Sequence, residues 1–372
     1  MIIFSYFFIF VLLMVLSVAL PRGRFLPLRT NGLNLSQSRK SSLLDPKVLF
    51  VLFLIGLFAG LRDESIGIDY ASYISFYNDI TSSDFDNPGW TGLEIGWIFL
   101  NLFFANLGFS SGLFFGLLAF MVWALFVKSA DDFSYLIPLM FFFVFCNGFF
   151  LWTLSGLRQT IAIMMFFYSI QFIRKNNFTY YALVIITASL FHASVIVMLP
   201  FFFLRYLPYN RVAALSLFTL SLAFIGENFT PLFIGDVYNY FITNNISFYQ
   251  LHLSDSERFS TLETTGTNLG LILRSIFSFF ILFYAKGIIR IKPEFKIYYL
   301  LFAIFAIMSN LFFSIELFAR LFLYFYSAFF VVAAASIYFS KGFLHKILSF
   351  FFLIGFTSLY FVTLYKNLSV TL

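Results

Sequence analysis

Residues 134–154 read SYLIPLMFFFVFCNGFFLWTL, a stretch without a charged side chain. A helix that crosses the hydrocarbon core of a bilayer needs about 20 predominantly apolar residues, and its backbone hydrogen bonds must be made inside the protein. As a helix, this stretch meets both conditions. We therefore predict that residues 134–154 span a membrane.

The composition of the whole chain also indicates a membrane protein. Of the 372 residues, 61% are hydrophobic and 11% are charged, whereas about a quarter of the residues in a soluble domain are charged. The 61 phenylalanines are too many for one globular core and suit helices that face lipid acyl chains. The net charge of +6 is an orientation signal beside the spans and not a nucleic-acid-binding surface. The composition predicts an all-α, polytopic integral membrane protein that binds no nucleic acid.

Motifs exclude several kinds of site. Cys146 is the one cysteine of the chain, so a disulfide framework, a CxxC zinc site and an iron–sulfur site are not available. The chain has no GxGxxG, Walker, HExxH or GxSxG pattern, which argues against nucleotide hydrolysis, zinc proteolysis and serine hydrolysis. Asp84-Phe85-Asp86 is a DxD triplet of the kind that binds a divalent cation, but such triplets arise easily in acidic loops. We expect no cofactor and no metal.

Hydrophobic runs divide the chain into about 11–12 transmembrane helices within a single transmembrane domain, 1–372. The predicted spans are 1–20, 46–61, 112–127, 134–154, 158–173, 178–204, 212–228, 268–285, 297–315, 319–340 and 346–365. The first is a span and not a signal peptide, because no Lys or Arg precedes Arg22.

Two stretches do not fit a simple count of spans. Residues 94–109 are apolar but short, and 178–204 is long, with His192 near its middle. Basic residues favour the cytoplasmic side of a membrane, and Lys and Arg cluster there only if 94–109 is a re-entrant or interfacial helix on the outer side. The same rule favours a hairpin of two short helices for 178–204, with a single tilted helix as the alternative. Segments 62–111 and 229–267 then become the outer loops.

Four arginines are not explained as orientation signals: Arg62, Arg158, Arg274 and Arg320. Each lies at or just inside the predicted outer end of a span, where a guanidinium needs a polar cavity and a partner. Together they are suited to hold one diphosphate, because planar guanidinium groups bind its oxygens in bidentate fashion. The alternatives are structural. Arg320 is one helical turn from Glu316, and Arg62 could extend to the membrane interface.

A proton acceptor and a sugar-binding loop are also predicted on the outer side. His192 is suited to remove a proton from a hydroxyl group near neutral pH, although a histidine bonded to backbone at a hairpin tip is the structural alternative. Asp69 lies in the loop after Arg62, followed by Tyr70 and Tyr73. Carboxylates bind sugar hydroxyls and aromatic faces stack on sugars, but acidic and aromatic residues also collect at interfaces without a ligand.

A set of ordered motifs resembles the EpsG family of exopolysaccharide proteins, which is similar in role to the Wzy-type O-antigen polymerases. The motifs are Leu61-Arg62, Gly67-Ile68-Asp69-Tyr70 with Tyr73, Gly92-Leu93-Glu94-Ile95-Gly96, Leu157-Arg158-Gln159 with Ala162, Phe191-His192-Ala193-Ser194, and Ala319-Arg320-Leu321 with Tyr324-Phe325. Each motif is weak alone, but the ordered set from about residue 50 to about 330 is fairly specific.

The resemblance implies a bacterial inner-membrane glycosyltransferase with a periplasmic active site. It would move a glycan chain from undecaprenyl diphosphate to the next lipid-linked repeat unit without a metal. Arg158 and Arg320 match family arginines, His192 the family histidine and Asp69 the loop aspartate, whereas Arg274 matches no motif. His192, or in second place Asp69, would be the catalytic base that takes the proton of the acceptor hydroxyl. We assign Tyr70, Tyr73 and Glu94 to the sugar. The implied partners are the lipid-linked oligosaccharide, the bilayer, a chain-length regulator and a flippase.

Two rival functions remain open. One is a flippase or transporter for the same lipid-linked sugar, which would place charges near the membrane midplane and show internal repeats. The other is a metal-dependent glycosyltransferase that uses a lipid-phosphate-sugar donor, with Asp84 and Asp86 as metal ligands. The charges here lie near the outer edge of the predicted spans, which favours the polymerase.

Overall fold

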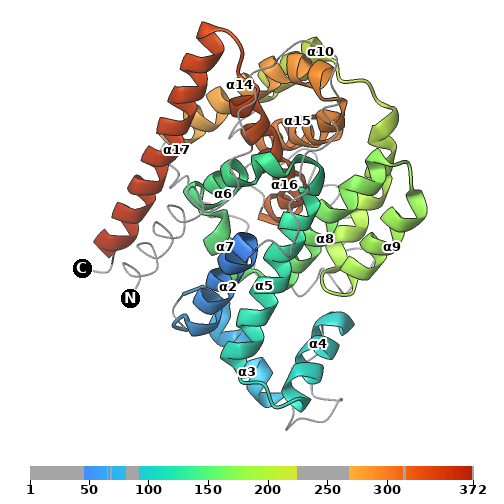
Figure 1. The fold of residues 1–372 in the computed structure, drawn as a ribbon, viewed down its shortest axis with the longest axis vertical. Coiled ribbons are helices and arrows are strands. Elements are labelled where there is room, and N and C mark those ends of the chain that lie inside the picture. The colour runs from blue at the N-terminus through green and yellow to red at the C-terminus, as the bar shows by residue number, and fades with distance from the viewer. Residues whose placement is uncertain are drawn as a thin grey trace, which may run out of the picture.

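The structure is a computed structural model that describes residues 46–64, 66–67, 69–80, 92–223, 268–312 and 316–370. The predicted span 1–20, the loop 229–267 and the Asp84-Phe85-Asp86 triplet lie outside the described residues. Every regular element in the described part is helical. The helices are α2 (Pro46–Leu61), α3 (Tyr70–Asp79), α4 (Ile95–Asn106), α5 (Ser111–Ser129), α6 (Ile137–Cys146), α7 (Phe149–Ser155), α8 (Leu157–Arg174), α9 (Phe178–Ser189), α10 (Arg211–Leu222), α14 (Asn268–Ile291), α15 (Lys296–Leu311), α16 (Glu316–Tyr338) and α17 (Phe343–Val370), with 3₁₀ segments η2 (Asp131–Leu136), η3 (Ala193–Tyr206) and η4 (Pro293–Phe295) (Figure 1).

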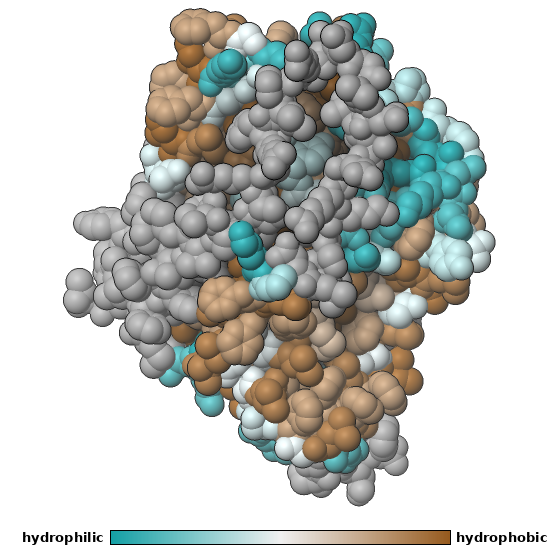
Figure 2. Space-filling model, in the orientation of Figure 1, coloured by the Kyte–Doolittle hydropathy of each residue, from teal (hydrophilic) through white to brown (hydrophobic). Residues whose placement is uncertain are grey.

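The protein is an all-α, multi-pass membrane protein. Within the described residues, four helices are long and apolar enough to cross a membrane, and a bent helix pair brings the number to five. Several other predicted spans, including α2, α9 and α10, are shorter apolar helices. Large apolar side chains remain exposed on α2, where Phe50 and Phe53 are 50% and 57% exposed. Apolar side chains also cover much of the face drawn in Figure 2, over α2 and α5 and at the upper end of α17.

The central element is α16, with α6, α8 and α15 around it (Figure 1). Of its membrane-spanning window, Arg320–Tyr338, 72% is buried, against 39% to 56% for the other three long spans. Its second half contains a run of small residues, Ala333–Ala335, all fully buried. Small side chains allow neighbouring helices to approach closely in a membrane. Helix α16 can therefore pack closely against the helices around it.

The stretch 134–154 forms two helices and not the one continuous helix predicted from its hydropathy. Helices α6 and α7 meet at an angle of 68° around Asn147 and Gly148. Gly148 has a φ of +76°, a backbone conformation that favours glycine. The Asn147 amide donates to the Tyr326 hydroxyl at 2.8 Å, and its Oδ1 accepts from the Phe149 backbone N–H at 2.9 Å. These bonds satisfy polar groups that a broken helix would otherwise leave unpaired.

Glycines bring α2 and α5 together as an antiparallel pair. A Cβ atom on Gly60 would lie 2.5 Å from the Gly112 carbonyl oxygen, and one on Gly56 would lie 2.9 Å from that of Gly116. The end of α2 is therefore beside the start of α5, so the chain between them leaves and returns at the same end of the pair.

This glycine contact should be sensitive to substitution. We expect Gly60→Leu to separate α2 from α5, because the new side chain would collide with backbone, which cannot rotate away. The expected result is a large loss of folded protein, measured as a lower melting temperature in detergent. Gly287→Leu is the matched control, since nothing lies within 4 Å of a Cβ at that position. Equal melting temperatures for the two variants would contradict the prediction.

Helix α4 lies within the connection between α2 and α5, at one end of the molecule (Figure 1). Its 12 residues extend about 18 Å, too short for a hydrocarbon core of about 30 Å. Ile95 and Phe99, one turn apart, are 70% and 68% exposed, whereas Trp97 and Asn101 are buried on the opposite face. A short helix with one exposed apolar face suits the membrane interface.

Candidate functional site

The candidate site is centred on the carboxylate of Glu94, which lies just before α4. Arg158 donates from Nη1 to Glu94 Oε2 at 2.5 Å, and His192 Nδ1 lies 3.1 Å from Glu94 Oε1. The three side chains are partly buried, with exposures of 12% for Glu94, 27% for Arg158 and 25% for His192. Three segments far apart in the sequence therefore meet at one charged cluster.

His192 is placed by a hairpin. Helices α9 and η3 pack antiparallel, because the Tyr181 hydroxyl donates to the Met198 carbonyl at 2.5 Å and the rings of Phe178 and Phe202 lie 5.1 Å apart. His192 occupies the turn between them, with an extended backbone. The structure thus has the hairpin and not the single tilted helix for 178–204.

The hairpin tip is attached to α4 by a close backbone contact. The Gly96 N–H donates to the Leu190 carbonyl at 2.8 Å. A Cβ atom on Gly96 would lie 2.6 Å from the same oxygen, so only glycine allows this approach. Because Glu94 and His192 are each two residues from this contact, it fixes the distance between their side chains.

Arg158 is placed by the start of α8, after the break between α7 and α8 at Gly156. The neighbouring Gln159 donates from Nε2 to the backbone carbonyl of Arg320 at 2.7 Å. This bond joins the start of α8 to α16 at Arg320, whose side chain is exposed. The backbone of Arg320 is therefore next to the cluster.

The electrostatics of the cluster favour an ionised Glu94. Burial raises the pKa of this carboxyl, but the hydrogen bond to His192 and the positive charge of Arg158 outweigh burial and lower the pKa below its ordinary value. Burial also raises the pKa of the Tyr73 phenol, partly offset by Arg158. The Tyr73 ring packs edge-on against Trp97 of α4, with centroids 5.2 Å apart.

Arg62 and Tyr70 form a separate buried pair. The guanidinium carbon of Arg62 lies 3.6 Å from the centroid of the Tyr70 ring, and Nη2 donates to the Leu154 carbonyl at 3.0 Å. Arg62 is 8% exposed and Tyr70 is 1% exposed. Burial lowers the pKa of Arg62 to about 10. The pair holds the start of the loop against α7, and the Tyr70 ring is covered.

The remaining predicted residues lie apart from the cluster. Asp69 is exposed at the start of α3. Arg274 donates from Nη2 to Asn310 Oδ1 at 3.1 Å and lines a cavity to which the other three arginines do not contribute. Within the described residues, the structure thus brings together Glu94, Arg158 and His192 with the backbone of Arg320, and it does not bring Arg62 or Arg274 into this cluster.

Sequence reasoning gave no role to Ser194 or Tyr324, although both lie in quoted motifs. Ser194 Oγ and the Tyr324 hydroxyl are 3.0 Å apart, which attaches the hairpin to α16 one turn after Arg320. Gln159 was also left without a role. The signal for all three was a polar residue within four positions of a candidate charged residue. Within the described residues, no three His, Cys, Asp or Glu side chains gather as a metal site.

A comparison with known families explains why these motifs occur together. The sequence profile of the EpsG family matches residues 47–371, nearly the whole chain and all of the cluster. The chain belongs to the EpsG family. EpsG is a Wzy-like polymerase family, so a function of the polysaccharide polymerase type follows in general terms. No curated protein and no solved structure matches this EpsG chain significantly.

The cluster offers two chemical capabilities to an EpsG protein. An imidazole whose Nδ1 faces a carboxylate presents Nε2 to a ligand as a proton acceptor, since the carboxylate fixes the tautomer and the ring orientation. A guanidinium beside it can stabilise negative charge that develops on a leaving group. Proton removal and charge stabilisation are the two needs of a glycosyl transfer to a hydroxyl group.

Proposed function

We propose that this EpsG protein is a polysaccharide polymerase that transfers a growing glycan from undecaprenyl diphosphate to a hydroxyl group of the next lipid-linked repeat unit. The main support is the Glu94–Arg158–His192 cluster, which combines a proton acceptor, its orienting carboxylate and a cation. The cluster opens at the ends of helices and not at their middle, which suits a substrate held in the membrane by its lipid and reacting at the surface.

In the proposed reaction, the acceptor hydroxyl attacks the anomeric carbon of the donor sugar. His192 Nε2 takes the hydroxyl proton while Glu94 holds Nδ1, so the imidazolium that forms is stabilised by a carboxylate. The bond between the anomeric carbon and the diphosphate oxygen breaks, and the electron pair leaves with the lipid diphosphate. The proton on His192 is then released to water or to the departing diphosphate.

We assign Arg158 and Arg320 to the departing diphosphate. Negative charge on this group increases as the sugar bond breaks, so a fixed cation lowers the energy of the transition state more than that of the bound substrate. Arg158 already faces Glu94 with one nitrogen, and its exposed part remains available to a ligand. Arg320 is exposed at the start of α16. Tyr73, whose phenol interacts with Arg158, is the sugar-binding candidate at this site, and the exposed Asp69 lies four residues before it at the start of α3.

The distribution of charge supports a periplasmic site in an inner membrane. At the other end of α8, about 24 Å from Arg158 along the helix axis, Arg174 pairs with Asp132. Arg205 donates to the Ile173 carbonyl at 3.1 Å, and Lys296 donates to the Arg205 carbonyl at 2.7 Å. A basic end of this kind faces the cytoplasm in most membrane proteins. The cluster lies at the opposite end of α8, which is the periplasmic end in this proposal. The lipid-linked substrate, a chain-length regulator and a flippase are the partners that we expect there.

Two observations on cells and purified protein test this function. Purified protein with lipid-linked repeat units should give a ladder of polymers, and a deletion strain should accumulate single repeat units on the periplasmic side. Accumulation on the cytoplasmic side would instead indicate a flippase. A ladder that is lost on adding a chelator and restored by a divalent cation would indicate the metal-dependent alternative.

A further inference from the structure

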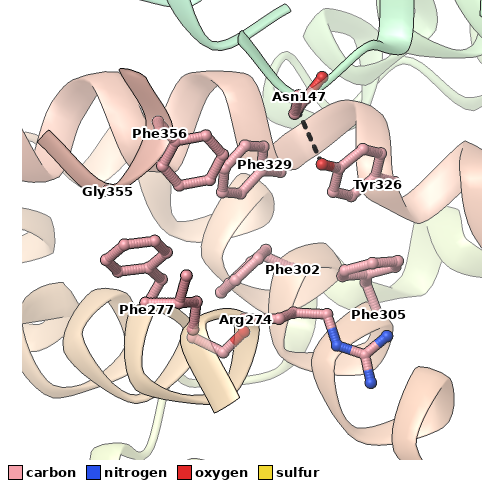
Figure 3. Close-up of a pocket in the computed structure, with 11 residues that line it drawn as sticks. Asn147, Arg274, Phe277, Phe302, Phe305, Tyr326, Phe329, Gly355 and Phe356 are labelled. Carbon is pink, nitrogen blue, oxygen red and sulfur yellow. Dashed lines mark hydrogen bonds between the residues drawn. The ribbon is translucent and has the colours of Figure 1, made fainter. Parts of the chain in front are cut away.

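A second cavity lies away from the cluster, between α6, α14, α15, α16 and α17. Its volume is about 250 Å³, and its lining includes the aromatic rings of Phe277, Phe302, Phe305, Tyr326, Phe329 and Phe356. Figure 3 shows the rings gathered around the space, with Asn147 and Tyr326 bonded at its edge. A cavity of this kind suits a short length of branched hydrocarbon chain.

Arg274 gives the cavity its positive charge, and the other described lining residues are neutral. Its guanidinium is directed toward Phe305 and away from Phe277 (Figure 3). Arg274 donates to Asn310, whose amide nitrogen donates in turn to Ser221 Oγ at 2.9 Å. Asn310 and Ser221 lie near the ends of α15 and α10, so this network holds the guanidinium at one end of the cavity. A cavity lined by aromatic rings, with a fixed cation at one end, suits a hydrocarbon chain that ends in a phosphate group.

The cavity and the cluster lie on different faces of the same helix. Residues two apart on a helix differ by about 200° in direction. Tyr324 therefore points to Ser194 on the hairpin, whereas Tyr326 lines the cavity. The exposed Arg320 lies one turn before Tyr324. Helix α16 thus separates two cationic sites.

We propose that the Arg274 cavity is a second lipid-phosphate site, which takes the first units of a polyisoprenyl chain between its aromatic rings and the attached phosphate at Arg274. The inference rests on the proposed function, because a polymerase must hold two lipid-linked molecules, a donor and an acceptor. The donor diphosphate lies at Arg158, the acceptor phosphate lies at Arg274, and α16 keeps the two lipids apart. Their sugars meet near the exposed Arg320 of α16.

Binding of a short isoprenyl phosphate tests this site. Farnesyl monophosphate is titrated into the full-length protein in detergent, and the number of bound molecules and their dissociation constants are measured. We expect two molecules per wild-type chain. Arg274→Gln should weaken one of them at least tenfold, and Ser278→Met, which fills part of the cavity, should do the same without altering its charge. Arg158→Gln should remove the other molecule and leave the cavity site intact.

Matched controls separate this site from general lipid binding. Arg290→Gln makes the same change at an exposed position on the same helix and should retain both molecules. Farnesol, which lacks the phosphate, should bind the cavity at least tenfold more weakly. A wild-type stoichiometry of one, unchanged binding in both Arg274→Gln and Ser278→Met, or equal displacement by phosphatidylglycerol would each overturn the proposal. If two molecules bind as described but no polymer forms, the polymerase function fails while the lipid site stands.

Discussion

Polymer formation is expected to fall about 10²-fold to 10³-fold when Arg158 is replaced by glutamine, the usual effect of removing one group that stabilises a developing negative charge. Glutamine keeps a hydrogen-bond donor near Glu94 but removes the charge that we assign to the departing diphosphate. The rate of ladder growth from purified lipid-linked repeat units measures this effect. We expect Arg158→Lys to retain more activity than Arg158→Gln, because it keeps the charge but loses the bidentate geometry.

The control for this experiment lies on the same helix. Arg174 also pairs with an acidic residue, Asp132, but at the opposite end of α8. Arg174→Gln therefore removes an equivalent ion pair without touching the cluster and should keep the rate of ladder growth per folded protein. Similar losses per folded protein in Arg158→Gln and Arg174→Gln would mean that the loss is not specific to the cluster. Full activity in Arg158→Gln would contradict the assignment of Arg158 to the departing diphosphate.

Replacement of His192 by glutamine is expected to lower the rate by about 10²-fold to 10⁴-fold, the contribution of a positioned general base. The loss should appear in kcat more than in KM, because the proton moves only as the transition state forms. Steady-state kinetics on purified protein measure kcat and KM separately.

Variants of Glu94 and His345 are the comparisons for His192→Gln. Glu94→Gln should also lower kcat, because an amide oxygen can hold the His192 ring but cannot stabilise its positive charge as a carboxylate does. His345 is buried far from the cluster, stacked on the Tyr284 ring at a centroid distance of 3.7 Å. His345→Gln should therefore keep the kcat of the wild type. A His192→Gln variant with an unchanged kcat would remove His192 from the role of base.

Hydropathy predicted the fold class well because a lipid environment demands long apolar helices. It failed at Asn147 and Gly148, where two polar or flexible residues within an apolar stretch break the helix. An Asn-Gly pair is a turn signal in soluble proteins. In this chain the signal was outweighed by the surrounding phenylalanines, and the partner that makes the break stable, Tyr326, lies far away in the sequence.

The candidate site was predicted in part. Positive-inside reasoning and ordered motifs selected Arg158, His192 and Glu94, but they did not show that Glu94 bridges the other two, because this contact depends on how the α4 start meets the hairpin tip. Sequence reasoning also gathered four arginines at one diphosphate. The membrane side of a residue can be read from charge patterns, but the face of a helix that meets a given neighbour depends on tertiary packing, and packing directs Arg62 to Tyr70 and Arg274 to another cavity.

The glycine contact between α2 and α5 has a mechanical consequence. The two backbones touch with no side chain between them, so rotation of either helix about its own axis would cause a collision. We therefore expect α2 and α5 to move as one rigid unit. A polymerase has to shift its product by one unit in every cycle. In the proposed polymerase, we therefore expect the movements of each cycle to occur in helices other than α2 and α5.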